Sequence, residues 1–461
     1  MMPVNSFDNY PMSWKPKIRK GGDIPLYIEV AQALEMDVRN GQLNPNDKLP
    51  PQRELADYLD VNLSTIARAF KLCTAKGLIS GEVGRGTYIS SDVLSKFPML
   101  DQCGLEHCVN LGASHPLYNQ NKYVVQVLKQ IIKKTNVTNL LEYTETSGRF
   151  GHKLSGQNWL FQFGLKVPVE NILISSGLQN SLAIILTSLF RFGDKIVTNS
   201  VIYPGIKNIA NSLGIQLIPI PYSGQRMNID YLVQLCKNEN IKGIYIIPDH
   251  HNPTTHFMSE RERWDLSTVI KQYGLICIED ATYSFLSDKK YPAVASMVPE
   301  QCIYISTVSN SLSAGLRVAF LSMPSSYSEQ IKKGNSDINV MAAPLEVEIT
   351  SQLIETGVAQ KIIQEKRIEL QRRNKLVDKY LSDFPIKGEA NSQFRWLRLP
   401  PKWTGKQFEA VAKENGVQVF CCERFIVGSA IVEPAVRLAI STPHNREDLE
   451  KGLKIIKNIL K

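Results

Sequence analysis

Residues 304–317 (YISTVSNSLSAGLR) place hydroxyl side chains and an arginine in one short segment. Thr307, Ser309 and Arg317 are of the types that hold a phosphate, because hydroxyls donate hydrogen bonds and a guanidinium forms charge-assisted pairs with anions. Asn310 lies among them. Its amide nitrogen is neither a nucleophile nor a base, so the segment predicts anion binding without covalent chemistry at this position.

A second candidate for anion binding is ISSGLQ at residues 174–179, where a strand-like run leads into a helix-like one. The backbone N–H groups of Gly177, Leu178 and Gln179 would face an anion, with the positive end of the helix dipole behind them. The plain alternative for this segment taken alone is an ordinary turn between a strand and a helix.

Two more polar clusters follow apolar runs. Asp280 ends the run LICIED, with Tyr283 three residues on, and Asn252 lies in HHNPTT at residues 250–255. Taken singly, the aspartate is equally well interpreted as a buried hydrogen-bond acceptor, and HHNPTT as a proline turn. His250 and His251 are interpreted as polar loop residues at the rim of a cleft.

These clusters need a scaffold that brings strand ends together. From about residue 109 onward, strand-like apolar runs alternate with helix-like stretches, which predicts an α/β domain with a largely parallel central sheet. The runs are NILISSG, KIVTNSVI, QLIPIPY, GIYIIP, LICIED and CIYIST. Ligands of such sheets bind at the carboxyl ends of the strands, where the polar clusters fall.

The first ninety residues follow a different pattern. Apolar residues at Tyr27, Val30, Leu34 and Val38 predict a helix that stops at Gly41. Leu55 and Leu59 predict a second short helix, the residues DVN a tight turn, and Ser64 the N-cap of a third helix that buries Ile66, Phe70 and Cys73. A helix-turn-helix of this kind inserts its second helix into the major groove of DNA. LISGEVGRGTYIS then predicts a two-stranded wing; a small docking domain is the alternative.

The composition of the chain argues against several classes of protein. The chain has 461 residues, enough for roughly three domains, and no apolar run that could cross a membrane or act as a signal peptide, so we expect a cytoplasmic protein without a membrane partner. The eight cysteines lack CxxC spacing, so we expect reduced thiols and no metal site. The net charge is +9, but residues 1–90 hold 11 Lys and Arg against 10 Asp and Glu. Any DNA contact there therefore depends on a few placed residues.

The segment from PLYIEV to GTYIS resembles the winged-helix domain of the GntR family of bacterial transcription regulators. The resemblance implies contacts with a double-stranded DNA operator, and the residues it implicates are Arg53, Ser64, Thr65, Arg68, Arg85 and Gly86. Many members carry an arginine where Leu63 stands, so one base or phosphate contact is expected to differ.

The C-terminal part resembles the type I fold of pyridoxal-phosphate-dependent aminotransferases through EYTETSGRFGH, ISSGLQNSL, NSVIYPGIK, DHHNPTT, IEDATYSFL, STVSNSLSAGLR and VRLAIS. The resemblance implies that Asp280 keeps the pyridine nitrogen protonated, that Asn252 and Tyr283 bind the ring hydroxyl, and that Tyr203 stacks on the ring. It further implies a phosphate site, whose residues are Gly177, Leu178, Gln179, Thr307, Ser309 and Arg317. Arg437 corresponds to the arginine for a substrate carboxylate, and Tyr143 to a tyrosine that reaches the phosphate of a neighbouring subunit in a head-to-tail homodimer.

A GntR winged helix fused to such a domain resembles the MocR subfamily of regulators. We expect an N-terminal extension (1–24), the winged helix (25–90), a linker (91–108), a large domain (109–345) and a C-terminal subdomain (346–461). The family's lysine, which bonds covalently to the cofactor, is replaced by Asn310, and no catalytic residue remains to substitute for it. Ala314, Ala319 and Thr255 also depart from the family's proline, glycine and glycine. Lys289 and Lys290 are interpreted as solvent-exposed.

Because general-base loss alone lowers rates by about 10²–10⁴, we expect little or no turnover. Three interpretations of the site stay open: noncovalent sensing of pyridoxal phosphate or its amino acid adduct as effector, drift to another ligand or to a scaffold, and a substituted form of a lysine-bearing protein. The alternative function is an aminotransferase with an unusual active site.

Overall fold

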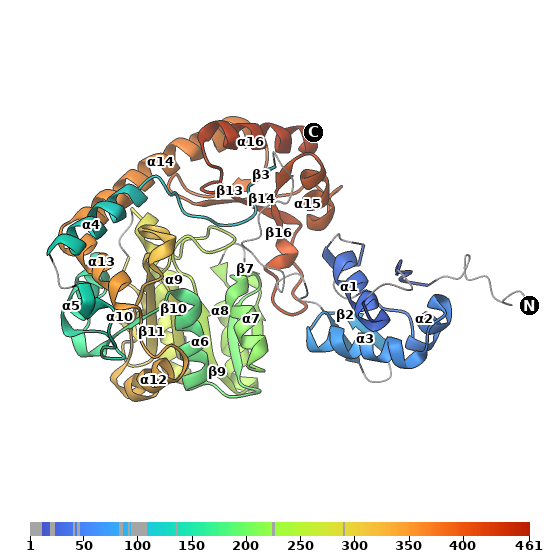
Figure 1. Ribbon diagram of the computed structural model, residues 1–461, viewed down its shortest axis with the longest axis horizontal. Coiled ribbons are helices and arrows are strands. Elements are labelled where there is room, and N and C mark those ends of the chain that lie inside the picture. The colour runs from blue at the N-terminus through green and yellow to red at the C-terminus, as the bar shows by residue number, and fades with distance from the viewer. Residues whose placement is uncertain are drawn as a thin grey trace, which may run out of the picture. The chain divides into compact units, whose positions relative to one another are not determined.

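The computed structural model describes residues 12–18, 24–39, 42–43, 47–82, 86–90, 93, 108–134, 137–223, 226–288 and 291–461. The chain forms two compact units, Met1–Pro98 with Lys406–Ala410 and Met99–Gly405 with Val411–Lys461 (Figure 1). The expected extension at 1–24 and the linker at 91–108 fall largely outside the described residues.

The N-terminal unit has the expected order of elements: helices α1 (Leu26–Arg39), α2 (Gln52–Leu59) and α3 (Leu63–Ala75), then strands β1 (Ile79–Glu82) and β2 (Gly86–Ile89). The two strands form an antiparallel hairpin. The buried faces predicted for the three helices are confirmed, with Leu34, Leu55 and Phe70 among the buried residues.

The start of α3 differs from the prediction. Ser64 is not its N-cap, because the helix begins at Leu63 and Asn62 occupies the cap position without a side-chain hydrogen bond to the helix. Asp60, in the left-handed conformation with φ of 47°, makes the turn that follows α2. The tight turn itself was predicted, but α3 begins two residues earlier than expected, which leaves Ser64 inside the first turn.

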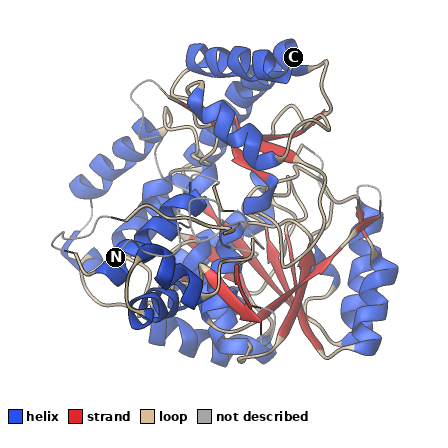
Figure 2. Ribbon diagram, turned by 90° about the vertical axis from the view of Figure 1, so that its right-hand side faces the viewer, coloured by secondary structure: helices blue, strands red, loops and turns tan. Residues whose placement is uncertain are grey.

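The second unit is built on a seven-stranded sheet in the order β4-β12-β11-β10-β9-β5-β6. The strands are β4 (Ile172–Ser175), β5 (Lys195–Asn199), β6 (Gln216–Ile220), β9 (Ile241–Ile246), β10 (Ile276–Asp280), β11 (Cys302–Thr307) and β12 (Ala319–Ser322). Only β12 runs antiparallel to its neighbours β4 and β11. The mostly parallel sheet predicted from the apolar runs is confirmed, and Figure 2 shows its strands lying side by side among helices.

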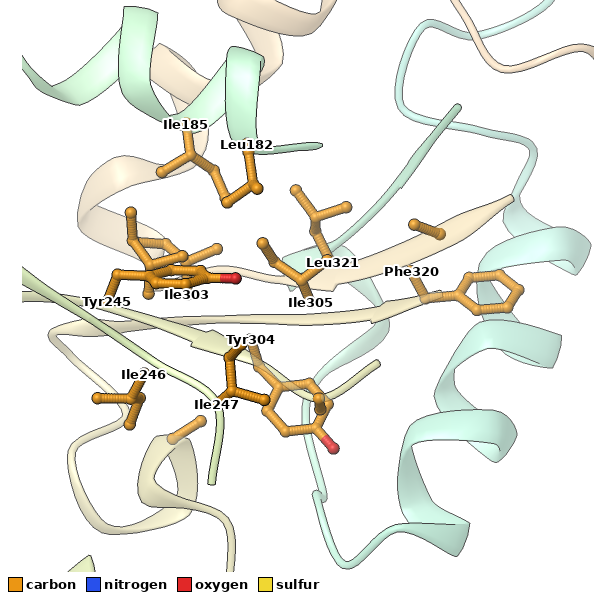
Figure 3. Packing of buried hydrophobic residues seen from close by; sticks show 14 of the residues in the cluster. Leu182, Ile185, Tyr245, Ile246, Ile247, Ile303, Tyr304, Ile305, Phe320 and Leu321 are labelled. Carbon is orange, nitrogen blue, oxygen red and sulfur yellow. The ribbon is translucent and has the colours of Figure 1, made fainter. Parts of the chain in front are cut away.

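Apolar side chains cover both faces of the central strands, which is why these strands are nearly continuous runs of Ile, Leu and Val. Ile303 and Ile305 of β11 alternate with Tyr304, and all three are fully or almost fully buried. Figure 3 shows Leu182 and Ile185 of helix α6 (Leu178–Leu189) on one side of the sheet.

The other helices of this unit are α4 (Asn121–Lys134), α5 (Phe150–Gln162), α7 (Pro204–Ser212), α8 (Ile229–Asn238), α9 (Glu260–Tyr273), α10 (Val294–Met297), α11 (Val308–Ser311), α12 (Ser325–Ile338), α13 (Pro344–Glu355), α14 (Val358–Leu381) and α16 (Arg446–Leu460). The residues of helix α15 (Gly405–Glu414) are divided between the two units. None of the helices in the described ranges is both long enough and apolar enough to span a membrane.

A second, smaller sheet in this unit has the order β13-β14-β17-β16, with strands Ile386–Lys387, Phe394–Arg398, Ala435–Ala439 and Phe420–Cys421. Beside it, β3 (Val109–Asn110) pairs in parallel with β15 (Val417–Gln418). The strands β7 (Tyr222–Ser223) and β8 (Arg226–Met227) form a separate antiparallel ribbon. Residues at the beginning of this unit thus lie beside residues near its end.

The cysteines depart from expectation at one position. Cys108 is disulfide-bonded, so the prediction of reduced thiols throughout is wrong there. Among the described residues, the cysteines outside a disulfide are Cys73, Cys236, Cys277, Cys302, Cys421 and Cys422. Spacing could not reveal this bond, because a disulfide needs only two cysteines whose backbones approach in the folded chain.

Candidate functional site

The carboxyl ends of the parallel strands bring the predicted residues to one edge of the large sheet. Asp280 is the last residue of β10 and Thr307 the last of β11. Gly177 follows β4, and Asn252 follows β9. The four polar clusters, far apart in the sequence, therefore share the edge at which ligands of such sheets bind.

Asp280 is held by hydrogen bonds from the scaffold. Its Oδ2 accepts a bond of 2.6 Å from the hydroxyl of Tyr245, and its Oδ1 accepts bonds from the backbone N–H, at 3.0 Å, and the hydroxyl of Thr282. Burial raises the pKa of this carboxyl above its ordinary value. Tyr245 was not predicted as a site residue, because it lies in the middle of the apolar run of β9.

The start of α6 is open to an anion. Gly177 caps the helix with φ of 89°, in the region that glycine alone adopts easily, and no acidic side chain lies in the first turn. A Cβ atom at Gly177 would lie 2.8 Å from a guanidinium nitrogen of Arg317. The positive end of α6 and the Arg317 guanidinium thus converge on one spot.

Arg317 is also tied to the loop that follows β11. Its Nη1 donates to the hydroxyl of Ser309 at 3.1 Å, and the hydroxyl of Thr307 donates to the same oxygen at 3.3 Å. The predicted hydroxyl and arginine cluster is therefore assembled in space, with Arg317 itself exposed to solvent.

Asn310 lies in α11 within the same loop, and it is half-buried. Its backbone carbonyl accepts a hydrogen bond of 3.0 Å from Lys366 Nζ, which also donates to the carbonyl of Leu312 at 2.9 Å. Lys366 comes from α14 and is fully buried. Burial lowers the pKa of its amine to about 7. Its position was not predicted, because a single lysine in a polar helix is usually solvated.

Tyr203 lies at the start of α7 and accepts a hydrogen bond of 2.7 Å on its hydroxyl from Gln179. Burial raises its pKa; the nearby charge of Asp280 also raises it, while those of Arg317 and Arg437 lower it. The charges of Asp280, Arg317 and Arg437 all affect the pKa of Tyr203, so these predicted residues lie near one another.

Arg437 lies on β17 and is fully buried. Its guanidinium donates to Asn252 Oδ1 at 2.8 Å and to the carbonyl of Gly112 at 2.6 Å, while its Nε has no hydrogen-bond partner. Asn252 Nδ2 in turn donates to the Tyr283 hydroxyl at 3.4 Å. Burial lowers the pKa of Arg437 to about 10, and no carboxylate contributes to that pKa.

The loop after β9 contains His250, His251 and Thr255, for each of which the sequence led to a specific expectation. His250 and His251 are buried, so their interpretation as rim residues is wrong. Burial lowers the pKa of His251 to about 3, which keeps its ring neutral. Thr255 has φ of 61°, a conformation that suits the glycine expected there better than a β-branched residue. Lys289 and Lys290 lie outside the described residues.

A separate cavity of about 880 Å³ lies between the loop after β9 and the smaller sheet. Thr254 and Phe257 line it on one side, and Trp396 and Arg398 on the other. None of the residues predicted to bind cofactor lines it, so this cavity is distinct from the cluster around Asp280.

In the N-terminal unit, the predicted DNA contacts face outward. Arg53, on α2, and Ser64 and Arg68, on α3, are exposed, and Thr65 is half-buried. Gly86 begins β2 and is exposed, whereas Arg85 lies outside the described residues. The exposed face of α3 and the hairpin that follows thus carry the predicted groups.

The comparisons with known proteins agree with both units. The family Aminotransferase class I and II matches residues 106–456, and the bacterial regulatory proteins of the gntR family match residues 26–89. An uncharacterized HTH-type transcriptional regulator, YdeF of Bacillus subtilis (strain 168), is 41% identical over 459 residues, covering 100% of this chain and 99% of its own. The HTH-type transcriptional regulator NorG of Staphylococcus aureus (strain N315) is 24% identical over 62% of this chain and 70% of its own.

Solved structures show the same fold for the larger unit. An archaeal alanine:glyoxylate aminotransferase superposes with a TM-score of 0.73, at 21% identity, over 85% of this chain and 98% of its own. A kynurenine aminotransferase of Pyrococcus horikoshii gives 0.71, at 22% identity, over 78% and 93%. The chain therefore belongs to the aminotransferase class I and II family and carries, in front of that domain, the domain of the bacterial gntR regulatory proteins.

Proposed function

We propose that this protein is a transcription regulator of the MocR type, in which the winged helix binds a double-stranded DNA operator and the aminotransferase-like domain binds a small effector. The DNA-binding half is supported by the gntR match at residues 26–89 and by relatives named as HTH-type transcriptional regulators. The outward positions of Arg53, Ser64 and Arg68 support it as well.

The proposed effector is pyridoxal phosphate or its adduct with an amino acid. The residues present fit such a molecule: Asp280 suits a ring nitrogen, Tyr203 a ring face, and the α6 start with Arg317 a phosphate. When bound, pyridoxal phosphate supplies an electron sink. Asp280, whose pKa is raised by burial, can share a proton with the ring nitrogen.

Arg437 is the residue proposed to bind a carboxylate of the effector. A buried guanidinium without an anionic partner is costly, and its Nε lacks a hydrogen-bond acceptor. A carboxylate that accepts from Arg437 would remove both penalties at once. Pyridoxal phosphate alone has no carboxylate, so this residue favours the amino acid adduct.

The presence of Asn310 is the main reason to propose that the site binds a ligand as a sensor and does not catalyse a reaction. Thr307, Ser309 and Arg317, which suit a phosphate, are hydrogen-bonded to one another in the same loop, yet the Asn310 side chain cannot bond covalently to an aldehyde or relay a proton. Lys366, a buried amine, donates hydrogen bonds to the backbone carbonyls of Asn310 and Leu312 in this loop. We therefore propose noncovalent binding, with drift to another phosphorylated or carboxylate ligand as the competing outcome.

We further propose a head-to-tail homodimer. Tyr143 is 87% exposed, as a residue that serves the neighbouring subunit's phosphate would be in one protomer. Leu141, Phe150 and Phe161 are exposed on the same part of the chain, at 72%, 59% and 65%. Several large apolar side chains exposed within one stretch of the chain support a protein interface there.

Effector binding changes regulation only if it favours one arrangement of the dimer's winged helices over another, because equal affinity for two states shifts neither. The test is fluorescence anisotropy with DNA from upstream of the protein's own gene, with and without phosphopyridoxyl-alanine. We expect sequence-selective, salt-dependent binding whose affinity changes with the effector. Equal binding to random DNA contradicts the proposal. Sustained formation of keto acid from an amino acid and pyridoxal phosphate would instead favour an enzyme.

A further inference from the structure

The first residue of α3, Leu63, is an exposed apolar side chain on a surface otherwise suited to DNA. It is 41% exposed, although leucine is among the residues most often buried. Helix α3 buries Ile66, Ala69, Phe70 and Cys73, and helical spacing places Leu63 at the edge of that same face. Part of the Leu63 side chain therefore stays accessible at the start of the helix.

The surroundings of Leu63 point to a nucleic-acid partner. The exposed residues that follow it on α3 include Ser64, Arg68 and Lys71, and the helix contains no acidic residue. A hydroxyl and two cations complement phosphates and base edges, whereas a protein partner for an apolar patch would find only one large apolar side chain here. The start of a recognition helix is also the part that contacts base edges in the major groove.

Leucine limits which base it can favour. Its side chain has no hydrogen-bond donor or acceptor, so it cannot distinguish bases by their polar edges. In the major groove, the 5-methyl group of thymine is the apolar feature that a base presents. We propose, on the basis of the proposed DNA-binding function, that Leu63 determines operator specificity by packing against the methyl group of a thymine in each half-site.

The experiment begins with duplexes that the full-length protein selects from a random library. In the selected duplex, each thymine is replaced in turn by deoxyuridine, which removes only the methyl group and keeps base pairing. We expect one position in each half-site at which the wild-type protein loses about fourfold in affinity, the factor that corresponds to one buried methyl group. At that position, 5-methylcytosine should bind better than cytosine.

The variant Leu63→Ala should bind the thymine and deoxyuridine duplexes equally at that position. Met36→Ala is the matched control, since Met36 is a 62% exposed apolar residue on α1 of the same unit, and it should keep the wild-type sensitivity. Leu63→Arg should shift the selected base from thymine towards guanine, which arginine binds through two hydrogen bonds. Both positions are exposed, so folding is expected to survive each change, and circular dichroism checks it.

The outcomes separate the two proposals. If the wild type selects a sequence but tolerates deoxyuridine at every thymine, or if Leu63→Ala keeps the sensitivity, the role of Leu63 is wrong and the regulator function stands. If the protein selects no sequence at all, DNA recognition itself fails, and the inference fails with it.

Discussion

Lys366 Nζ lies 3.0 Å from the backbone oxygen of Asn310, the residue that we predict to occupy the position of the family's cofactor-binding lysine. The buried amine of α14 thus holds the loop after β11 through main-chain atoms and bonds Leu312 in the same way. Such contacts with carbonyls do not depend on the side chain at position 310. These two hydrogen bonds would therefore be available to the loop with either asparagine or lysine at position 310.

The first prediction concerns pH and Lys366. Because burial lowers the pKa of this amine to about 7, the folded chain releases a proton that the unfolded chain keeps up to its ordinary value of 10.5. The unfolded state binds more protons between these values, so the free energy of unfolding should rise with pH there, by up to about 1.4 kcal/mol per pH unit. Urea denaturation at several pH values measures it.

The variant Lys366→Met should lose this contribution. The unfolding free energy of the wild type minus that of the variant should therefore increase as the pH rises above about 7. Lys375→Met, which changes an exposed lysine of the same helix, is the control and should follow the wild type. A constant difference between wild type and Lys366→Met across this range would show that Lys366 is not a buried, titrating amine.

The second prediction concerns Arg437. Arg437→Met should weaken the binding of phosphopyridoxyl-alanine by about 2 kcal/mol or more, because a buried charge pair is lost. It should leave the affinity for pyridoxamine phosphate, which has no carboxylate, nearly unchanged. Isothermal titration calorimetry of both ligands measures this, with Arg398→Met as a control at a partly exposed arginine. Equal losses for both ligands would contradict the assignment.

The third prediction compares two glycines. Gly177 and Gly164 both have positive φ, 89° and 83°, so alanine at either should lower the free energy of unfolding by roughly 1 kcal/mol. Only at Gly177 would the new Cβ meet the Arg317 guanidinium; at Gly164 nothing lies within 4 Å. Phosphate-containing ligands should therefore bind more weakly to Gly177→Ala alone, as measured by calorimetry. Weaker binding by both variants would mean that strain is responsible.

The fourth prediction concerns Thr255, a β-branched residue with φ of 61°. Thr255→Gly should stabilise the protein by up to about 1 kcal/mol, because relief of backbone strain exceeds the added entropy of the unfolded glycine. Thermal unfolding measures the change, with Thr254→Gly as the neighbouring control that should destabilise. A loss of stability in Thr255→Gly equal to that of the control would show that the conformation carries no strain.

The sequence predicted the parallel strands well, because buried strands of such a sheet are continuous apolar runs that little else resembles. It did not predict β12, whose four residues begin at Ala319, two positions after Arg317, without a turn residue to mark the boundary. The N-cap of α3 was misplaced by two residues, because asparagine and serine are both common N-cap residues and the local pattern does not choose between Asn62 and Ser64.

At the site, the resemblance to type I aminotransferases was what named Asp280, Arg317 and Asn252 as members of one site. Residues that act through burial were missed, because burial is a property of the fold: Tyr245 is hidden in an apolar strand, and Lys366 in a polar helix. The same reason explains the error at His250 and His251, whose sequence context is polar while their positions are internal.

The most direct measurement of the central claim is an absorbance titration of the purified protein with pyridoxal phosphate, followed by borohydride reduction and peptide mass mapping, with Asn310→Lys in parallel. We predict saturable binding by the wild type without covalent attachment, and attachment at position 310 in the variant. Absence of binding by both proteins, or covalent attachment and turnover in the wild type, would contradict noncovalent sensing at this site.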